Sequence, residues 1–257
     1  MLRTERERVA AILLAAGSSE RMGSDKIWAD LCGQPLIAWP IQAFAATASI
    51  DALIVVVRSE TLERMRHLLG GLGLSAAVVV GGARRQDSVC VGLEAAAAAD
   101  WVVVHDGARP LVTPDLVQRG LDAAAATGAA VAAVPVVDTI KRVQAERVVE
   151  TLDRGSLWEA QTPQVFRTSL LVAAHRTPPH PFPSPPGERG NTSGATDDAM
   201  LVEALGVPVR VYMGAYGNIK VTNEVDLRVA AVLLEAQNEV TASAPDGLRA
   251  GSRGKSR

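Results

Sequence analysis

A loop of small residues with two cations follows the first apolar segment of the chain. The string LLAAGSSERMGSDK spans residues 13–26 and contains Arg21 and Lys26. Small side chains let a ligand approach the backbone, and the N–H groups of Ala15–Ser19 could bind polyphosphate oxygens. The two cations would add positive charge there. The loop therefore predicts a phosphate site, although an ordinary strand-to-helix loop with solvated charges stays open as the alternative.

A second set of polar residues follows the apolar segment at residues 101–105. Asp106 and Arg109 come directly after it, where a carboxylate and a guanidinium could meet a ligand at the end of a strand. These two residues alone do not assign a role to Asp106. His105 lies within the apolar segment, and we interpret it as a packed residue rather than a base.

Short apolar runs separated by amphipathic segments provide the framework for these residues. Continuous rather than alternating hydrophobicity is typical of strands that are buried on both faces of a parallel sheet. The apolar runs lie at Val9–Leu14, Ala52–Val57, Ala76–Val80, Trp101–His105 and Ala129–Val136. The segments predicted as helices lie at Leu36–Ala46, Glu60–Leu69, Asp87–Ala98 and Asp115–Ala126. We predict an α/β fold with a Rossmann-like, mostly parallel twisted sheet and helices on both faces, which binds ligands beyond the carboxyl ends of its strands.

The pattern changes after Val137. Residues 138–158 alternate Val, Ile and Leu with charged residues and show no helical period, which predicts an excursion of antiparallel strands out of the main sheet. The exposed edges of such a β-arm need a partner, and a second copy of the chain can supply one. We therefore expect a homodimer formed through this arm.

The chain is expected to form a single domain over residues 1–242. Within it, residues 178–194 are dense in proline and glycine and are predicted to be a disordered insertion, because proline ends helices and central strands. Residues 243–257 are predicted to be a disordered tail. Only 4% of the residues are aromatic whereas 48% are hydrophobic, so the core is expected to consist mainly of Ala, Val, Leu and Ile.

Charge and composition exclude several classes of protein. The formal net charge is -2, which provides no general electrostatic attraction for nucleic acid or for an anionic membrane surface. No apolar stretch is long enough for a transmembrane helix, and the charged N-terminus lacks the pattern of a secretory signal. The two cysteines are too few for a disulfide framework, and together these features favour a cytoplasmic protein.

Further motifs follow the loop in order along the chain. They are GGARRQDSV at 81–89, VHDGARP at 104–110, DTIKR at 138–142, DRGSLWEAQTPQVF at 153–166, TDDA at 196–199 and NIKVT at 218–222. The loop itself resembles the opening signature of the sugar-nucleotide type of nucleotidyltransferase. Together, over about residues 9–235 without the insertion, the motifs resemble the 2-C-methyl-D-erythritol 4-phosphate cytidylyltransferases of the non-mevalonate isoprenoid pathway.

The resemblance implies a reaction and its charged groups. It implies an enzyme that transfers CMP from CTP to 2-C-methyl-D-erythritol 4-phosphate and releases pyrophosphate, with Mg²⁺ bound mainly through the CTP phosphates. Arg21 and Lys26 match positions that stabilise the transition state and the leaving pyrophosphate. Arg154 and Lys220 match positions that hold the attacking phosphate. In this family, Arg154 and Thr139 reach the active site of the partner chain. The protein need not supply a nucleophile or a base, because the substrate phosphate is already ionised near pH 7.

The resemblance also assigns the binding residues. The nucleotide site of this family reads the base mainly through backbone groups. The matching positions here are Ala15, Ala16, Gly17, Gly81, Gly82 and Ser88. Positions matching the substrate site are Asp106, Arg109, Thr139, Thr162 and Thr196. Small hydroxyl residues in loops often serve only as turn or cap residues, and the insertion just before Thr196 could change how that segment closes over the substrate. By the resemblance, Asp106 would contact the substrate hydroxyls. A carboxylate at this position could alternatively help to hold magnesium, as in related nucleotidyltransferases, and the sequence does not separate these roles.

Three other functions compete with this one. A cytidylyltransferase for another polyol phosphate, such as ribitol 5-phosphate, would share the loop, the arm and the mechanism. A guanylyltransferase of the molybdenum-cofactor type would share the first loop, but the DTIKR, DRxxLW and NIKVT matches argue against it. A nonenzymatic nucleotide sensor could dispense with Arg154 and Lys220, so their presence favours an enzyme.

Overall fold

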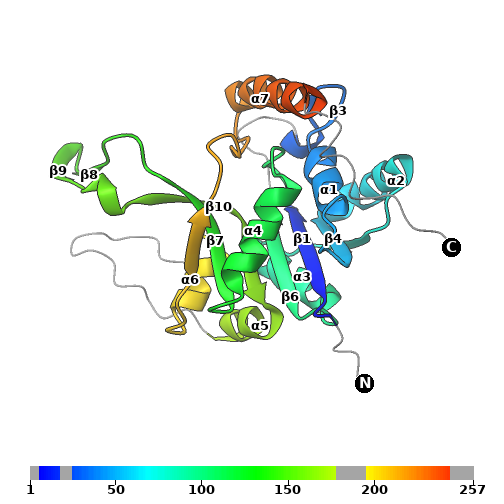
Figure 1. The fold of residues 1–257 in the computed structure, drawn as a ribbon, viewed down its shortest axis with the longest axis horizontal. Coiled ribbons are helices and arrows are strands. Elements are labelled where there is room, and N and C mark those ends of the chain that lie inside the picture. The colour runs from blue at the N-terminus through cyan, green and yellow to red at the C-terminus, as the bar shows by residue number, and fades with distance from the viewer. Residues whose placement is uncertain (1–5, 18–24, 178–194, 244–257) are drawn as a thin grey trace.

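A seven-stranded sheet forms the centre of the structure (Figure 1). The computed structural model describes residues 6–17, 25–177 and 195–243, so Arg21, the insertion and nearly all of the predicted tail lie outside the described residues. The order of the strands across the sheet is β11-β7-β10-β6-β1-β4-β5. Their bounds are β1 Val9–Ala15, β4 Ala52–Val57, β5 Ala77–Val80, β6 Trp101–Asp106, β7 Ala129–Pro135, β10 Trp158–Arg167 and β11 Arg210–Met213.

The predicted parallel strands are confirmed. β1 pairs in parallel with β4 and β6, and β5 pairs in parallel with β4. Every residue of β1 except Leu14 is buried, as expected for a strand covered on both faces. Because these four strands run in the same direction, their carboxyl ends meet at one edge of the sheet.

Helices cover both faces of the sheet, and the alternation of side chains along β1 shows why. Ala11 and Leu13 face a core cluster formed with α1, α2 and α4, whereas Ala10 and Ile12 face a second cluster formed with α3, α5 and α6. The helices of the first face are α1 Ala38–Ala45, α2 Leu62–Leu72 and α4 Pro114–Ala124. Those of the second face are α3 Arg85–Ala95, α5 Thr168–Arg176 and α6 Asp198–Glu203. The four helices predicted from the sequence are confirmed to within a few residues at each end.

The last helix, α7 at Glu224–Ser243, lies beyond the carboxyl edge of the sheet (Figure 1). Its Ala230 and Leu234 pack on a third core cluster that includes Leu31, Leu36 and Leu111. Two short strands, β2 at Asp30–Leu31 and β3 at Gln34–Pro35, form a separate two-stranded sheet. Within the described residues, short 3-10 turns lie at η2 Lys26–Trp28, η3 Ser59–Thr61 and η4 Arg154–Ser156.

Strand β10 was not predicted, and it changes the topology. It lies between β6 and β7 and runs antiparallel to both, so the sheet is mixed at this point. Its register against β7 shifts between Ala160 and Gln164, where the Thr162–Pro163 peptide is cis. This irregularity interrupts the alternation of side chains that usually marks a strand in a sequence.

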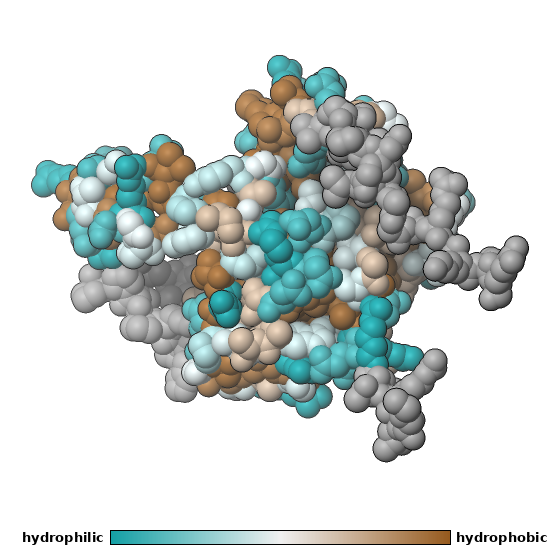
Figure 2. All heavy atoms as spheres, in the orientation of Figure 1, coloured by the Kyte–Doolittle hydropathy of each residue, from teal (hydrophilic) through white to brown (hydrophobic). Residues whose placement is uncertain are grey.

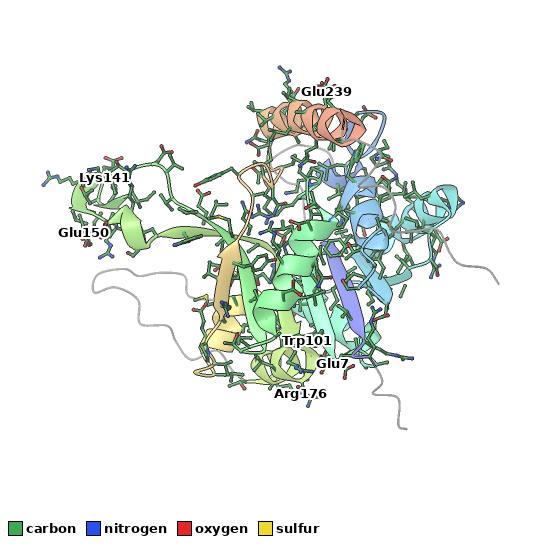
Figure 3. All side chains as sticks on the ribbon, in the orientation of Figure 1. Glu7, Trp101, Lys141, Glu150, Arg176 and Glu239 are labelled. Carbon is green, nitrogen blue, oxygen red and sulfur yellow. The ribbon has the colours of Figure 1, made fainter. Side chains whose placement is uncertain are left out.

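The predicted β-arm is present as an antiparallel pair of strands that projects from the body (Figure 1). Strands β8 Lys141–Gln144 and β9 Arg147–Thr151 form their own two-stranded sheet, and all of their residues are exposed. Lys141 and Glu150 lie on the arm, far from the main sheet. Glu7 and Trp101 lie together at the edge of the sheet where β6 begins (Figure 3).

Exposed apolar side chains gather on the arm. Val137, Val143, Val148 and Val149 are each more than half exposed. Figure 2 shows hydrophobic residues on the arm and on the outer part of α7. Within the described part of the chain, no helix is long and apolar enough to cross a membrane.

The close contact of α3 with β1 generates a stability prediction. A Cβ atom added at Gly92 would lie 2.5 Å from Cγ2 of Ile12, whereas a Cβ atom at Gly70 in α2 would meet nothing within 4 Å. We expect Gly92→Ala to lower the free energy of unfolding by about 1–3 kcal/mol through overpacking. The matched control Gly70→Ala should raise the free energy of unfolding by roughly 0.5–1 kcal/mol, because alanine has a higher helix propensity than glycine at an exposed helix position. Urea unfolding measures both, and equal effects would contradict the packing argument.

Candidate active site

A cleft of about 540 Å³ opens at the carboxyl edge of the sheet, and we call it the central cleft. Segments that follow β1, β4, β5 and β6 line it, as expected for a ligand site in a fold of this type. The predicted site residues that line it are Ala15, Ala16, Gly17, Lys26, Gly82, Ser88, Asp106 and Lys220. The fold thus brings together residues from four distant motifs.

On one side of the central cleft, the segment after β5 packs closely against β4 and against the segment after β1. The Gly81 N–H donates to the Val57 carbonyl over 2.8 Å. A Cβ atom added at Gly81 would lie 2.6 Å from Oγ of Ser88 and 2.9 Å from Cβ of Ala16, so this backbone position needs glycine. Ser88 itself is only 4% exposed but lines the cleft, and its hydroxyl lies 3.3 Å from the Arg84 carbonyl.

Asp106 is the central charged group of the cleft. Its Oδ2 lies 2.7 Å from Nζ of Lys220, and its Oδ1 lies 3.8 Å from Nε of Arg85. Burial alone would raise the pKa of Asp106, but the Lys220 ammonium and the Arg85 guanidinium outweigh burial and lower the pKa from 3.8 to about 2. Asp106 is therefore an anion at neutral pH, and it positions the Lys220 ammonium at the cleft.

Arg85, which the sequence leaves open as either a phosphate contact or a solvated charge, lines the central cleft. Its Nη1 lies 2.8 Å from Oδ2 of Asp198, which is fully buried, so Arg85 connects Asp198 to Asp106. The neighbouring Arg84 is largely exposed and pairs with Asp87. The signal that could have separated the two arginines is the spacing Arg84 to Asp87, which matches a helix-capping pair.

Arg58 is a residue that sequence reasoning missed. It follows β4, lines the central cleft and forms an ion pair with Asp25, directly before Lys26. A single arginine after an apolar strand gives no signal in the sequence that would separate it from a solvated charge.

Below the cleft, a hydrogen-bonded chain holds Asp106 in place. The Asp106 N–H donates to Oγ1 of Thr162 over 3.1 Å, and Thr162 Oγ1 lies 2.9 Å from Nδ1 of His105. His105 Nε2 lies 3.1 Å from the Arg109 carbonyl, which can only accept, so Nε2 carries the hydrogen and Nδ1 accepts from Thr162. Burial lowers the pKa of His105 to about 4. His105 is thus a packed, neutral residue, as predicted.

Thr162 therefore does not line the central cleft, although it was predicted at the substrate site. It is 4% exposed, and its hydroxyl contacts the backbone of Asp106 and the ring of His105. In this structure, the Thr162 hydroxyl orients the carboxyl end of β6.

A second cavity of about 490 Å³ adjoins the central cleft at Lys220, which lines both. Arg109 lines this side cavity together with Glu159 and Tyr216. Nη1 of Arg109 donates to the Asn218 carbonyl over 2.7 Å, whereas its buried Nε has no hydrogen-bond partner. A bound anion or hydroxyl group could satisfy this donor.

Three other predicted residues lie apart from the central cleft of their own chain. Thr139 and Arg154 are exposed at the base of the β-arm, where Arg154 donates to the Val137 carbonyl. Thr196 is exposed just before α6, and its hydroxyl makes a long contact of 3.8 Å with the sulfur of Met200. Arg21 lies outside the described residues.

The described residues contain no group of three or more His, Cys, Asp or Glu side chains arranged to hold a metal ion. In this part of the chain, Asp106 is the only carboxylate that lines the central cleft. A single carboxylate suits magnesium when a substrate triphosphate supplies the other oxygen ligands.

Comparisons with known proteins agree on one family. The family model described as 2-C-methyl-D-erythritol 4-phosphate cytidylyltransferase matches residues 9–236. An enzyme of that name from Dehalococcoides mccartyi strain 195 is 43% identical over 233 residues, which cover 89% of this chain and 97% of the relative. Its counterpart from Bacillus velezensis is 41% identical over 88% of this chain and 96% of the relative.

Solved structures give the same result. The crystal structure of 2-C-methyl-D-erythritol 4-phosphate cytidylyltransferase from Thermus thermophilus superimposes with a TM-score of 0.69 at 34% identity, covering 89% of this chain and 99% of that one. A 4-diphosphocytidyl-2C-methyl-D-erythritol synthase from Anaerococcus prevotii has a TM-score of 0.75 at 24% identity, over 89% of this chain and 99% of that one, which shows the shared fold.

The neutral, buried state of His105 generates a pH prediction. In the unfolded chain histidine takes up a proton near pH 6.5, whereas folded His105 does so only near pH 4. The unfolded state therefore binds more protons between these values, and stability falls as the pH drops. We expect His105→Asn to reduce the loss of unfolding free energy between pH 7.5 and pH 4.5 by roughly 2 to 3 kcal/mol. Urea titrations at both pH values measure this, and parallel losses in both proteins would show that His105 does not stay neutral.

Proposed function

The chain belongs to the 2-C-methyl-D-erythritol 4-phosphate cytidylyltransferase family, and we propose that it transfers the CMP group of CTP to 2-C-methyl-D-erythritol 4-phosphate. The products are 4-diphosphocytidyl-2-C-methyl-D-erythritol and pyrophosphate, and the reaction belongs to isoprenoid precursor biosynthesis. The observation that carries this proposal is Lys220, which Asp106 positions where the central cleft and the side cavity meet.

The reaction requires two anions to approach each other. An oxygen of the substrate phosphate attacks the α-phosphorus of CTP, and pyrophosphate leaves on the opposite side. The protein must position both groups and neutralise the negative charge that accumulates, which fixed cations do well in a partly buried site. No side chain has to remove a proton, because the attacking phosphate is already ionised. The neutral, fully hydrogen-bonded His105 is consistent with this mechanism.

The central cleft is proposed to bind CTP. Ala15, Ala16 and Gly17 would offer their backbone to the nucleotide, and Lys26 together with Arg21 would stabilise the transition state and the leaving pyrophosphate. Gly81, Gly82 and Ser88 would read the base. The close packing around Gly81 supports this assignment, because a fixed backbone can direct the hydrogen bonds that select cytosine.

The side cavity is proposed to bind the polyol phosphate. Lys220 would hold its phosphate, and Asp106 and Arg109 would contact the rest of the substrate. The unsatisfied Nε of Arg109 supports a polar ligand at this position. For Thr162, the hydrogen bonds to Asp106 and His105 support an indirect role, in which its hydroxyl positions Asp106. Thr196 remains a proposed substrate residue on the family pattern alone.

We also propose that Mg²⁺ takes part and that the enzyme acts in the cytoplasm. The triphosphate would supply most of the magnesium ligands, with Asp106 as the one available carboxylate, and the ion would neutralise phosphate charge. A cytoplasmic location is supported by the two free cysteines, Cys32 and Cys90.

A homodimer would complete the site. The exposed arm with its valine side chains supports a partner surface, because exposed apolar residues and free strand edges favour association. Arg154 and Thr139 lie at the base of this arm and do not line the central cleft of their own chain, which supports their proposed action in the cleft of the partner.

A substrate panel tests the function. Purified protein with magnesium is given each of the four nucleoside triphosphates, together with 2-C-methyl-D-erythritol 4-phosphate or ribitol 5-phosphate, and pyrophosphate release is measured. We expect release to require CTP and to be fastest with the methylerythritol substrate. Faster turnover with ribitol 5-phosphate would favour the alternative polyol specificity, and CTP binding without turnover would favour a sensor.

Mixing two inactive variants tests the shared site. Lys26→Ala and Arg154→Ala chains should each be nearly inactive alone, but random mixing should restore about a quarter of the native activity, because half of the dimers would contain one intact site. The control mixes Lys26→Ala with the double variant Lys26→Ala/Arg154→Ala, in which no intact site can form. Verified heterodimers without recovered activity would show that Arg154 acts within its own chain.

A further inference from the structure

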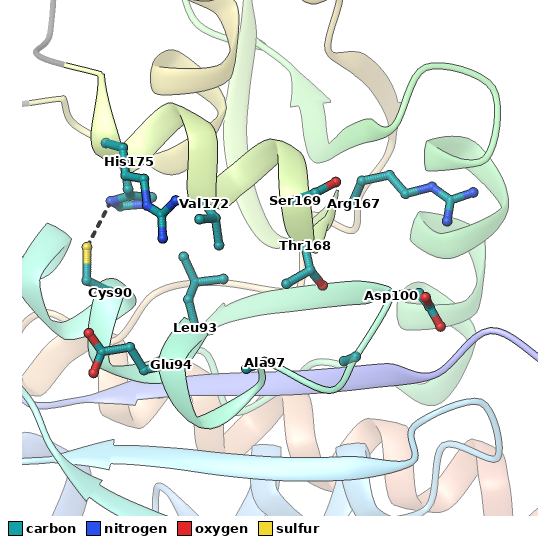
Figure 4. Close-up of a pocket in the computed structure, with 12 residues that line it drawn as sticks. Cys90, Leu93, Glu94, Ala97, Asp100, Arg167, Thr168, Ser169, Val172 and His175 are labelled. Carbon is teal, nitrogen blue, oxygen red and sulfur yellow. Dashed lines mark hydrogen bonds between the residues drawn. The ribbon is translucent and has the colours of Figure 1, made fainter.

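A groove of about 640 Å³ lies between α3 and α5, and none of the residues assigned to catalysis lines it (Figure 4). We call it the α3–α5 groove. Leu93 and Val172 line its middle, and Cys90 and His175 lie together at one end. None of the proposed transfer chemistry uses this groove.

Cys90, His175 and Asp198 form a continuous row of polar groups at that end. Sγ of Cys90 lies 3.5 Å from Nδ1 of His175, and Nε2 of His175 lies 3.0 Å from Oδ1 of Asp198. Asp198 also pairs with Arg85 through its other oxygen, so we assign the hydrogen of His175 to Nε2, which donates it to the carboxylate. Nδ1 is then left to accept the proton of the Cys90 thiol. A nucleophile, a base and a carboxylate that orients the base are the parts of an activated nucleophile.

The groove also contains a polar group without a partner. Thr168 lines it at the beginning of α5 and is 9% exposed, and its buried Oγ1 makes no hydrogen bond. Buried hydroxyls are normally paired, so this one is available to a polar group of a bound molecule. The groove therefore offers a thiol with a base at one end, an apolar middle and an unsatisfied hydroxyl.

The second cysteine provides a contrast within the same chain. Cys32 is exposed, and its sulfur has only a long contact of 3.9 Å to the Ala231 carbonyl. Burial raises the pKa of the Cys90 thiol, and Asp87 and Glu94 raise it further. Little Cys90 thiolate exists at neutral pH, so the reactivity of this thiol depends on the adjacent base.

We propose that Cys90, His175 and Asp198 form a thiol-modification site that reacts with small disulfides bound in the α3–α5 groove. As the Cys90 sulfur attacks one sulfur of the disulfide, His175 takes the thiol proton and the sulfur–sulfur bond breaks. The products are a mixed disulfide on Cys90 and a free thiol, which receives the proton from His175. No other oxidant is required, because the disulfide itself is reduced.

Modification at Cys90 should affect the central cleft through charged contacts. Asp198, which accepts from His175, also pairs with Arg85 at 2.8 Å, and Arg85 faces Asp106, which holds Lys220 at 2.7 Å. A group attached to Cys90 would occupy the space beside His175 and displace its ring from Asp198. Asp198 would then rearrange with Arg85, and Lys220 would lose its fixed position, so the modified enzyme should turn over more slowly.

The chemistry is tested with 4,4′-dithiodipyridine, an uncharged disulfide. The thiol that it releases is measured by its ultraviolet absorbance. The protein used is Cys32→Ser, in which Cys90 is the remaining cysteine. We expect one thiol to be released per chain. The rate constant for labelling of Cys90 should be at least tenfold lower in the variant that also carries His175→Gln, because glutamine keeps a donor toward Asp198 but removes the base. Equal melting temperatures and equal labelling rates in urea confirm that the two proteins differ only in the folded site. The proposal would be overturned if folded Cys32→Ser and folded Cys32→Ser/His175→Gln were labelled at equal rates. It would also be overturned if Cys32 in the Cys90→Ser protein were labelled faster than Cys90 in the Cys32→Ser protein.

The coupling is tested on the same labelled protein by pyrophosphate release. Labelled Cys32→Ser should lose at least four fifths of its turnover, a roughly fivefold decrease, and dithiothreitol should restore it. Cys32→Ser/Cys90→Ser treated identically should keep its activity. Full turnover after complete labelling would overturn the coupling, and an unlabelled protein that is inactive would instead contradict the proposed function.

Discussion

Charge balance around Asp106 is the constraint on which the site depends. A carboxylate that is almost enclosed by protein is stable as an anion only when cations compensate for the water it has lost. Lys220 and Arg85 supply this compensation, and Asp198 in turn balances Arg85. The cations of the cleft are therefore held by buried carboxylates rather than by solvent, and their positions are set before a substrate arrives.

The sheet makes this arrangement possible because it brings distant segments to one edge. Asp106 ends β6, Arg85 begins α3, and Asp198 begins α6, which follows the insertion. Antiparallel β10 contributes from within the sheet: Thr162 bonds the backbone of Asp106, and Gln164 accepts from the N–H group of Asp198. One strand thus fixes the relative positions of two carboxylates that lie 92 positions apart in the sequence.

The parts of the fold that follow from local patterns were predictable from the sequence. The apolar runs gave the parallel strands, and the motifs gave the lining of the central cleft, because both signals are contained in consecutive residues. Strand β10 was not predictable in this way, since its register shift breaks the alternation. The role of Arg85 depends on Asp198, which only tertiary folding brings near. Thr162 is buried because β10 pairs with β6. The spacing of residues in the sequence does not show this pairing.

The β-arm has a further consequence for how the molecule behaves in solution. Two strands that expose every side chain bury too little surface to be stable as an isolated hairpin. Their turn also holds Ala145 and Glu146 at positive φ angles of 46° and 61°, without the glycine that usually favours such a turn. In the proposed homodimer, contact with the partner chain would therefore order the arm. Its backbone amides would exchange with solvent first on dilution, while those of the central strands stay protected.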